Sequence, residues 1–496
     1  MVLSSKTEAV KAKYKIMTVT VDKKKMYLEN YFRYESGEVE PLIKGRLKAN
    51  IDFWREIGAN QYVIDIIDHG YAIPFYSTPD PAEFDNNNSA LNRADFVKDS
   101  IQELLDTGRI VQHTNKPIVV NPLTVSVNKK GKKRLILDLR YVNWYIYKSK
   151  IKFEDWKIFK EFAFEAEYAL SFDLKSGYHH IDVHNDFQTY LGFSWEYNGV
   201  KCYFTFTVLP FGLHSSPYVF TKCVKPLVAH WRNLGLKIVV YLDDGICAVT
   251  NVDEGRRAAN MVKSDLLKAG LVPNVEKSFW EPTIELKWLG ILWNFKEGIL
   301  KIPDEKLCNL KSSLHMVISK LTSISARELA RLTGLIISFT PCIGNITRLM
   351  TRFLYSEIDK AGTWDAKIDL GNNCDILREL TFWLENIDSF NGTKKFRDIT
   401  LPKDVLGYSD ASSFAAGGYI VHSTINFAQE WCHKTWTNEE REKSSTWREM
   451  RACWFALASY SKFFKGKQVK WFSDNKKLVS IIDKGSKKNW IYKRLL

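Results

Sequence analysis

The sequence predicts an α+β protein with several domains, and three observations along the 496 residues support this. Short apolar runs separated by turn residues predict strands mixed with helices over residues 116–305. Apolar residues at helical spacing then dominate residues 306–400. From residue 401 onward, alternating strand patterns return with a helix between them. The length indicates three or four domains, and 45% hydrophobic residues are enough to form several cores.

Charge and cysteine content narrow the functional classes. Lysine and arginine exceed aspartate and glutamate by 71 to 57, and the net charge of +14 suits a polyanionic partner such as nucleic acid. The eight cysteines include no C-x-x-C pair, which argues against a zinc module or a disulfide scaffold. The N-terminus has no apolar signal core, and no apolar run approaches about 18 residues. We therefore expect an intracellular protein, in cytoplasm or nucleus, that does not cross a membrane.

The first 115 residues are expected to precede the main fold. Residues 1–45 are polar and rich in lysine, which predicts a loose basic arm, and residues 46–115 form an N-terminal extension. Within the extension, a helix is predicted that ends at Gly108. Its apolar face is formed by Phe96, Val97, Ile101, Leu104 and Leu105. The triplet Asp106-Thr107-Gly108 matches aspartic proteases, but it closes this helix instead of following a buried strand. We therefore expect no protease site there.

The remaining elements follow from local patterns. Ser325-Ala-Arg-Glu328 is a capping box that begins a helix, residues 388–403 are expected to be a linker, and residues 404–422 alternate like a hairpin. The strand candidates before them are LTVSV (123–127), KRLILDL (133–139), IKFEDWKIF (151–159), YALSFDL (168–174), KCYFTFTVL (201–209), KIVVYL (237–242) and ICAVT (246–250).

Acidic residues lie at the ends of two of these apolar strands. Asp173 lies in YALSFDL, and Asp243 and Asp244 follow KIVVYL. Adjacent carboxylates repel each other, and burying one unpaired is costly. Strand ends that bring these acids together would therefore suit Mg²⁺, which prefers oxygen ligands. The alternative is a plain hairpin turn, because Asp and Gly favour turns.

Six motifs, in this order, resemble the fingers, palm and primer grip of reverse transcriptases. The resemblance implies a right-hand polymerase, with fingers and palm over residues 116–305 and a helical thumb or connection over residues 306–400. The motifs are KKRLILDLRYVN (132–143), SFDLKSGYHH (171–180), LPFGLHSSPYVF (209–220), YLDD (241–244), GLVPNVEKSFW (270–280) and LKWLGILW (286–293).

The resemblance implies roles for single residues. Asp173 and Asp243 would bridge two ions of Mg²⁺, or of Mn²⁺ as an alternative, with Asp244 more peripheral and the Leu174 carbonyl as a further ligand. Tyr178 would favour dNTPs by occupying the space of a ribose 2′-hydroxyl. The residues expected to contact the dNTP are Lys129, Arg134, Tyr178, Phe211, Gly212 and Lys277, and those of the primer grip are Trp288, Leu289 and Gly290.

Some of these roles have alternatives. Lys130 or Lys132 could take the place of Lys129, and Lys277 could be either a general acid or a surface lysine. Trp288, with the two residues after it, could be part of a plain core hairpin. His179 and His180 are expected to be structural residues that continue a strand.

A second set of acids lies near the C-terminus. Asp410, Glu449 and Asp474 follow the order strand acid, helix acid, strand acid, which resembles the RNase H fold. The resemblance implies that residues 401–496 are an RNase H-like α/β domain, in which these acids bind metal and cleave the RNA strand of an RNA–DNA hybrid. Because the chain ends 22 residues after Asp474 (496 minus 474), we expect this domain to be incomplete and its cleavage activity to be in doubt.

The expected function is RNA-directed DNA synthesis for a retroelement, with RNA template, DNA primer, RNA–DNA hybrid and dNTPs as partners. The wording of residues 45–79 and 449–466 is similar to DIRS-like retrotransposons, with long-terminal-repeat and pararetroviral elements as alternatives. A decayed or domesticated protein that binds nucleic acid without catalysis, and a polymerase restricted to DNA templates, are the alternative functions. The oligomeric state stays open.

Overall fold

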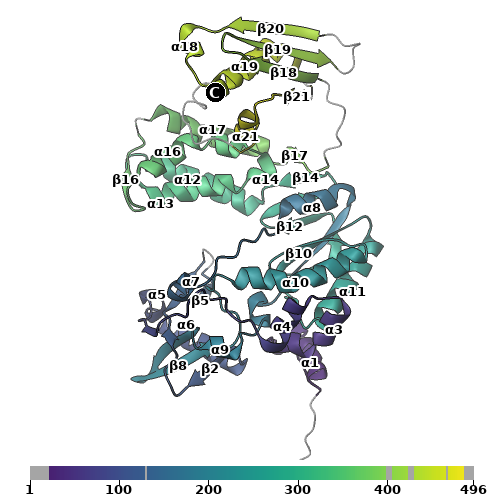
Figure 1. Cartoon of the computed structure of the whole chain (residues 1–496), viewed down its shortest axis with the longest axis vertical. Helices are drawn as coiled ribbons and strands as arrows, with labels where there is room; N and C mark the ends of the chain where they lie inside the picture. Colours follow the sequence, from purple (N-terminus) through teal and green to yellow (C-terminus); the bar gives the residue numbers. More distant parts are fainter. Residues whose placement is uncertain are drawn as a thin grey trace, which may run out of the picture. The chain divides into compact units, whose positions relative to one another are not determined.

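The computed structural model describes residues 22–128, 131–371, 373–397, 405–422, 429–464, 467 and 469–484 (Figure 1). These residues divide into two compact units. The first unit comprises the described residues up to Asp155, together with Leu170–Cys247 and Asp253–Glu281. The second comprises Trp156–Ala169, Ala248–Val252 and the described residues from Pro282 onward. None of the helices within the described ranges is long and apolar enough to cross a lipid bilayer.

The first unit begins with a folded helix, so the expectation of a loose arm over residues 1–45 is wrong for its described part. The carboxylate of Asp22 accepts the backbone N–H groups of Lys24 and Lys25 and caps the helix that follows. Tyr31 and Ile43 are buried, so a few apolar residues anchor a segment whose composition is polar. The helices of this region are α1 (Lys23–Glu35), α2 (Arg46–Ala49), α3 (Ile51–Glu56), α4 (Gln61–His69), α5 (Asn88–Leu91) and α6 (Ala94–Asp106). Helix α6 is the predicted one, and Gly108 follows it at φ +68°.

Two sheets with orders β1-β3-β7-β8-β2 and β4-β5 follow in the first unit. Strands β4 and β5 are antiparallel with Ser126 opposite Arg134, which places Arg134 near the tip of this hairpin. The strands are β1 (Ala82–Glu83), β2 (Ile110–His113), β3 (Val119–Val120), β4 (Leu123–Val127), β5 (Lys133–Leu137), β7 (Gly192–Tyr197) and β8 (Val200–Phe206). The short helices α7 (Arg140–Trp144) and α9 (Asn185–Gln188) lie between them in the chain.

The sheet that carries the central acids has the order β11-β6-β10-β9. Its members are β6 (Tyr168–Asp173), β9 (Lys237–Tyr241), β10 (Asp244–Val249) and β11 (Phe279–Thr283). Helices α10 (Ser216–Asn233) and α11 (Val252–Lys268) accompany it, and the indole N–H of Trp231 on α10 donates to Asp265 on α11 at 3.2 Å. The ring of Trp231 also packs edge-on against Phe172 of β6, with ring centroids 5.9 Å apart. This apolar packing explains why β6, β9 and β10 are near-continuous hydrophobic runs.

The second unit contains a sheet of order β12-β13-β14-β17, formed by β12 (Glu285–Trp288), β13 (Ile291–Asn294), β14 (Ile299–Lys301) and β17 (Lys394–Lys395). The predicted strand over residues 151–159 is wrong, because α8 (Trp156–Phe162) begins inside it. Phe159 and Ala163 are fully buried at helical spacing, and Phe159 packs edge-on against Trp293 with centroids 4.8 Å apart.

The middle of the second unit is helical, as predicted (Figure 1). The capping box of Ser325 and Glu328 is present in both directions. The expected linker over residues 388–403 is wrong in part, since its first residues finish a helix and Lys394 pairs with β14, while residues 398–403 lie outside the described ranges. The helices are α12 (Asp304–Ser319), α13 (Ala326–Ile337), α14 (Thr340–Ile343), α15 (Ile346–Leu349), α16 (Arg352–Lys360) and α17 (Cys374–Phe390), and the short strands β15 (Ile324–Ser325) and β16 (Lys367–Ile368) pair with each other.

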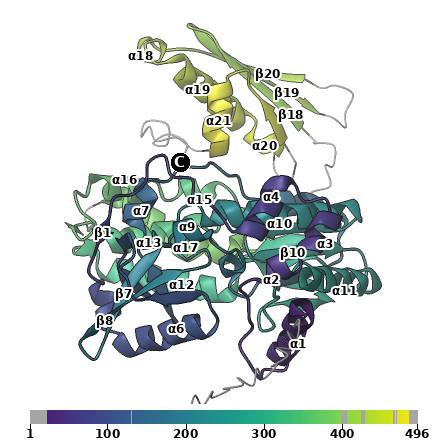
Figure 2. The ribbon, with the colours of Figure 1, turned by 60° about the horizontal axis from the view of Figure 1, so that its bottom comes forward.

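A last sheet has the order β20-β19-β18-β21. Its elements are β18 (Val405–Ala411), β19 (Ala415–His422), β20 (Gln429–Thr435) and β21 (Val469–Phe472), with α18 (Asn438–Arg441), α19 (Ser445–Ser459), α20 (Ser461–Phe464) and α21 (Lys476–Lys484). Strands β18 and β19 form the predicted antiparallel hairpin, and β21 joins β18 in parallel. Helix α19 covers one face of this sheet, where Val405, Ile420 and Ala456 are buried together (Figure 2).

Candidate active site

Asp173 and Asp243 lie at the adjacent ends of β6 and the β9–β10 turn. The backbone N–H of Leu174 donates to the carbonyl oxygen of Asp243 at 2.8 Å, so the two acids are joined through the chain next to them. A Cβ at Gly177 would lie 3.0 Å from the Cβ of Asp243, so the missing side chain leaves room for this acid. The structure therefore brings together two of the predicted metal ligands.

Gly245 is not part of the turn that carries Asp243. Leu242 adopts φ +56°, a conformation that is unfavourable for a bulky L-residue. Gly245 lies within β10, and a Cβ there would be 2.2 Å from the ring of Phe172. Glycine is therefore required at 245 for close packing of β10 against β6, and the turn itself is made at Leu242 and Asp243.

The carboxylate of Asp173 is held by a segment that follows α11. The Asn274 side-chain amide donates to it at 3.0 Å, and the Lys277 ammonium lies 3.0 Å and 3.1 Å from its two oxygens. The backbone N–H of Asn274 also donates to the carbonyl of Asp173 at 2.7 Å. The Lys277 side chain is 57% exposed, so it is a surface lysine that also contacts Asp173.

The electrostatics of Asp243 fit a cation site. Burial, followed by the nearby charge of Asp173, raises the pKa of the Asp243 carboxyl, while Lys277 and Arg134 act in the opposite direction. Asp244 begins β10 and is only partly buried, and Leu174 is 1% exposed. Among the described residues, the ligand atoms of the three aspartates do not all converge within 4.8 Å. Three neighbouring carboxylates are suitable ligands for Mg²⁺. Without the ion, the ammonium group of Lys277 pairs with Asp173.

Several candidate dNTP contacts surround these acids. Tyr178 packs against Phe211 with ring centroids 5.4 Å apart, and burial, followed by the charge of Asp243, raises the pKa of the Tyr178 hydroxyl to about 12. Gly212 adopts φ +113°, and a Cβ there would lie 2.2 Å from the carbonyl oxygen of Leu137. The close neighbour that requires glycine is thus the chain's own backbone. Arg134 is exposed near the hairpin tip, and Lys129 and Lys130 lie outside the described residues.

The expectation that His179 and His180 continue a strand is wrong. Both belong to the 3₁₀ helix η2 (Gly177–His180). The ring of His180 accepts the backbone N–H of Val272 at Nε2 (3.1 Å) and lies 3.1 Å from the Gly177 carbonyl at Nδ1. Burial lowers the pKa of both imidazoles to about 3. Neutral His180 thus connects the turn before Tyr178 to the segment that holds Asp173.

The predicted primer grip divides between core and turn. Trp288 is 1% exposed and packs against Phe159, so its side chain belongs to the hydrophobic core. Leu289 (φ +47°) and Gly290 (φ +70°) form the two-residue turn between β12 and β13. The ammonium of Lys306 donates to the carbonyl of Gly290 at 2.9 Å. The side chain of Leu289 and the backbone of the turn are therefore the parts that a primer could contact.

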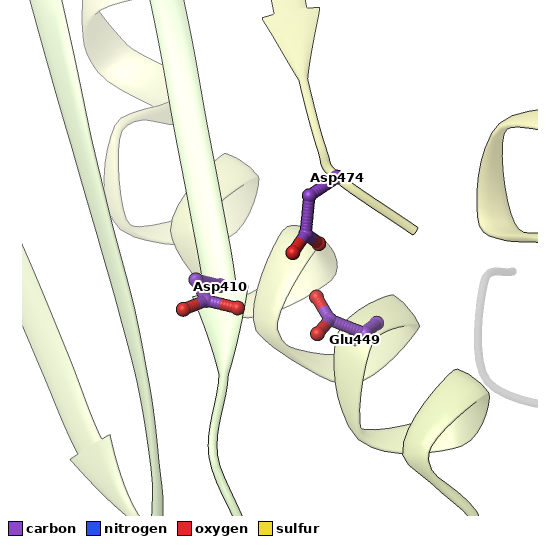
Figure 3. Close-up of side chains that lie close together, drawn as sticks. All are labelled: Asp410, Glu449 and Asp474. Atoms are coloured by element: carbon purple, nitrogen blue, oxygen red, sulfur yellow. The ribbon is translucent and has the colours of Figure 1, made fainter. Parts of the chain in front are cut away.

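The second acidic set converges closely in the C-terminal sheet. One carboxylate oxygen from each of Asp410, Glu449 and Asp474 lies within 4.8 Å of the others, and Figure 3 shows the three side chains pointing toward one another from β18, α19 and the end of β21. Glu449 is 7% exposed, and its Oε2 has no hydrogen-bond partner among the described residues. Burial and the two aspartates raise the pKa of Glu449 to about 7. These groups fit a divalent cation.

Aromatic rings line the sheet face beside this second set. The ring of Tyr408 stacks on Tyr419 at 4.6 Å and on Phe472 at 4.9 Å, and Trp431 continues the row. A cavity of about 750 Å³ lies over these rings and is also lined by Asp410 and Asp474. A substrate in this cavity would contact both the rings and the carboxylates.

Sequence reasoning missed three residues that shape the first site. Asn274 contacts Asp173 directly, Gly177 makes room for Asp243, and Ser278 accepts the backbone N–H of Asp173 at 3.2 Å. Asn274 and Ser278 flank Lys277 in the GLVPNVEKSFW motif, so their closeness to a candidate residue was the available signal.

Comparison with known proteins agrees with this architecture. Residues 127–292 match the sequence profile of the family described as Reverse transcriptase (RNA-dependent DNA polymerase). The chain is 24% identical over 363 residues to the retrovirus-related Pol polyprotein from transposon opus of Drosophila melanogaster, covering 69% of this chain and 33% of that protein. It is 28% identical over 220 residues to the corresponding polyprotein from transposon gypsy, covering 43% and 20%. The chain thus spans a third or less of the length of these relatives.

Solved structures show the same fold. The structure described as foamy viral protease-reverse transcriptase dRH in complex with double-stranded DNA has a TM-score of 0.53 and 18% identity, covering 89% of this chain and 78% of that one. The same viral protein with an RNA/DNA hybrid has a TM-score of 0.53 and 18% identity, covering 89% and 60%. The predicted α+β polymerase fold is therefore confirmed. From these matches and the strand-end acids, this chain contains a reverse transcriptase domain of the kind found in retrotransposon and retroviral Pol polyproteins.

Proposed function

We propose that the chain is an RNA-directed DNA polymerase that adds dNTPs to a primer 3′-end by a two-metal mechanism. The observation that carries this proposal is the pairing of Asp173 with Asp243 at adjacent strand ends of a reverse transcriptase domain. The net charge of +14 supports a nucleic-acid partner, whose binding should weaken steeply with salt. The nucleic acids expected are an RNA template, a DNA primer and their hybrid.

Asp173 and Asp243, with Asp244 and the Leu174 carbonyl beside them, are the groups that would hold Mg²⁺. When bound, such ions activate the primer 3′-hydroxyl and stabilise the leaving pyrophosphate. The residues of the chain then orient the substrate. The ammonium group of Lys277 lies 3.0 Å from Asp173 and would leave this carboxylate to bind the triphosphate. It would then supply a proton to the pyrophosphate. Arg134, on the β4–β5 hairpin, would contact the phosphates. Tyr178, packed against Phe211, would close the space next to the sugar.

Primer extension on an RNA template with dNTPs and Mg²⁺ tests this proposal. The parent chain and the exposed control Asp253→Asn should extend the primer, whereas Asp243→Asn should not. Extension by all three proteins would overturn the assignment of Asp243. Template binding without extension by the parent would favour the alternative of a nucleic-acid-binding protein without catalysis. A parallel DNA template separates RNA-directed synthesis from a polymerase restricted to DNA.

We further propose that Asp410, Glu449 and Asp474 form a hydrolytic site of the RNase H type that acts on the RNA strand of a hybrid. Their convergence within 4.8 Å, the unpartnered Glu449 oxygen and the adjacent cavity support this. A hybrid with labelled RNA should be cleaved in Mg²⁺ by the parent chain and not by Glu449→Gln. Cleavage by both proteins, or by neither, would contradict this role.

The proposed origin is a DIRS-like retroelement. It rests on the wording of residues 45–79 and 449–466, whereas the relatives reported above are Pol polyproteins of opus and gypsy. Sequencing of the genomic locus tests it, since a neighbouring tyrosine recombinase gene supports this origin and a neighbouring integrase gene contradicts it.

A further inference from the structure

Residues near the N-terminus contact the segment whose side chains bind the carboxylate of Asp173. We call residues 269–278 the support loop and residues 31–54 the N-terminal segment. The indole N–H of Trp54, a fully buried residue, donates to the carbonyl of Ala269 at 2.9 Å. A Cβ at Gly270 would lie 2.5 Å from the carbonyl oxygen of Arg46. The two backbones are therefore in direct contact where the support loop begins.

Apolar packing continues this contact along the loop. Tyr31, Ile43 and Val272 form one buried cluster, and Tyr34 packs against it. On α11, the Lys263 ammonium lies 2.5 Å from the Glu35 carboxylate, which holds α1 beside α11 (Figure 2). The position of Val272, two residues before Asn274, thus depends on α1 and on Ile43.

Polar contacts reach the strand end itself. The backbone N–H of Val275 donates to the Tyr34 hydroxyl at 3.4 Å. The ammonium of Lys175 lies 3.1 Å from the Glu40 carboxylate and 5.5 Å from the centre of the Tyr34 ring. The backbone N–H of Lys175 donates to the Val272 carbonyl at 2.9 Å. Two segments of the chain meet at Asp173: the support loop and the residues just after β6. Tyr34 contacts both of them, and Glu40 contacts the second through Lys175.

We propose that the N-terminal segment is a positioning element of the polymerase site, with Tyr34 and Glu40 acting through the support loop and Lys175 on Asp173 and Lys277. This inference rests on the proposed polymerase function and extends it, because the segment lies outside the reverse transcriptase match at residues 127–292. The support loop carries two of the groups on the Asp173 carboxylate, so a shift of the loop changes where that carboxylate points. Misplacement of catalytic groups by about 1 Å can cost up to about a hundredfold in rate.

The double variant Tyr34→Phe/Glu40→Gln tests the proposal in the full chain. It keeps the Tyr34 ring and the size of residue 40 and removes only the hydroxyl and the charge. Glu40 is 54% exposed, so its ion pair contributes little to stability. The matched control is Glu38→Gln, which also removes one exposed carboxylate, but one that pairs with Arg33 and Ser36 within its own segment.

Single-nucleotide incorporation on a primed RNA template separates rate from folding. For the double variant we expect the incorporation rate to fall by about threefold to tenfold. Burst amplitude, melting temperature and primer–template Kd should match the parent, and Glu38→Gln should match it in all four measurements. An unchanged rate in the double variant overturns the proposal. So does a smaller burst amplitude with an unchanged rate, because that result reports fewer folded molecules. A parent chain that incorporates nothing overturns the polymerase function, and this inference falls with it.

Discussion

The two acidic sites of this chain handle repulsion between carboxylates in different ways. At the first, Asp173 is neutralised by Lys277 and accepts a hydrogen bond from Asn274, and the described acids do not converge within 4.8 Å. At the second, Asp410, Glu449 and Asp474 converge within that distance, and a buried oxygen of Glu449 has no partner among the described residues. At the first site a lysine of the chain thus faces the carboxylate of Asp173, whereas at the second site three carboxylates face one another. Removing charge should have opposite effects at the two sites.

The largest effect is expected where the neighbouring strands β6 and β10 pack together at the first site. Gly245→Ala places a Cβ 2.2 Å from the Phe172 ring, so β10 must move away from β6 and carry Asp243 with it. Loss of alignment should reduce primer extension by about a hundredfold or more. Gly417→Ala in β19 is the matched control, because a Cβ there meets nothing within 4 Å. Normal extension by Gly245→Ala would show that the β6–β10 spacing does not set the geometry of the site.

Asp173→Asn should destabilise the protein. The amide cannot neutralise Lys277, and it presents an N–H group to a pocket arranged around an acceptor, so we expect a loss of about 1–3 kcal/mol in the free energy of unfolding. Denaturant unfolding without divalent cations measures this loss. An unchanged or higher stability would remove the difference between the two sites.

Glu449→Gln should have the opposite sign. In the absence of divalent cations, it removes a buried charge that faces Asp410 and Asp474, and we expect a gain of about 1 kcal/mol. Mg²⁺ should raise the melting temperature of the parent by more than that of Glu449→Gln, in which the first site can still bind the ion. Equal Mg²⁺ shifts in the two proteins would show that this carboxylate does not bind the ion.

A pH-dependent effect is expected at the two buried histidines of the first unit. Their pKa values are about 3 in the folded protein and near 6.5 when unfolded, because burial disfavours the imidazolium. The unfolded chain therefore binds protons first, and stability is complete above pH 6.5 and declines as the pH falls below it. His179→Phe should reduce this decline, since Nδ1 of His179 has no partner among the described residues. A parent stability that is flat between pH 7 and 5 would contradict this account.

Local patterns were sufficient for many elements of the fold. The capping box at Ser325, helix α6 and the β18–β19 hairpin all depend on residues close in sequence, and the structure contains each of them. Residues 151–159 show where this reasoning fails, since Phe159 can belong to a strand or a helix until its partner Trp293 is known. Likewise, a lysine-rich composition hid the few apolar residues that fold the N-terminal segment.

By itself, the sequence determined that strand-end acids come in two groups and that the first lies in a reverse transcriptase-like order, because these features depend on spacing along the chain. Only the tertiary structure decided which partners the acids have. Asn274 reaches Asp173 across 101 residues, and Tyr34 reaches Val275 across 241 residues. It also placed Trp288 in the core and required glycine at 245 for the Phe172 ring. Such contacts depend on the packing of distant segments, which no local pattern of residues encodes.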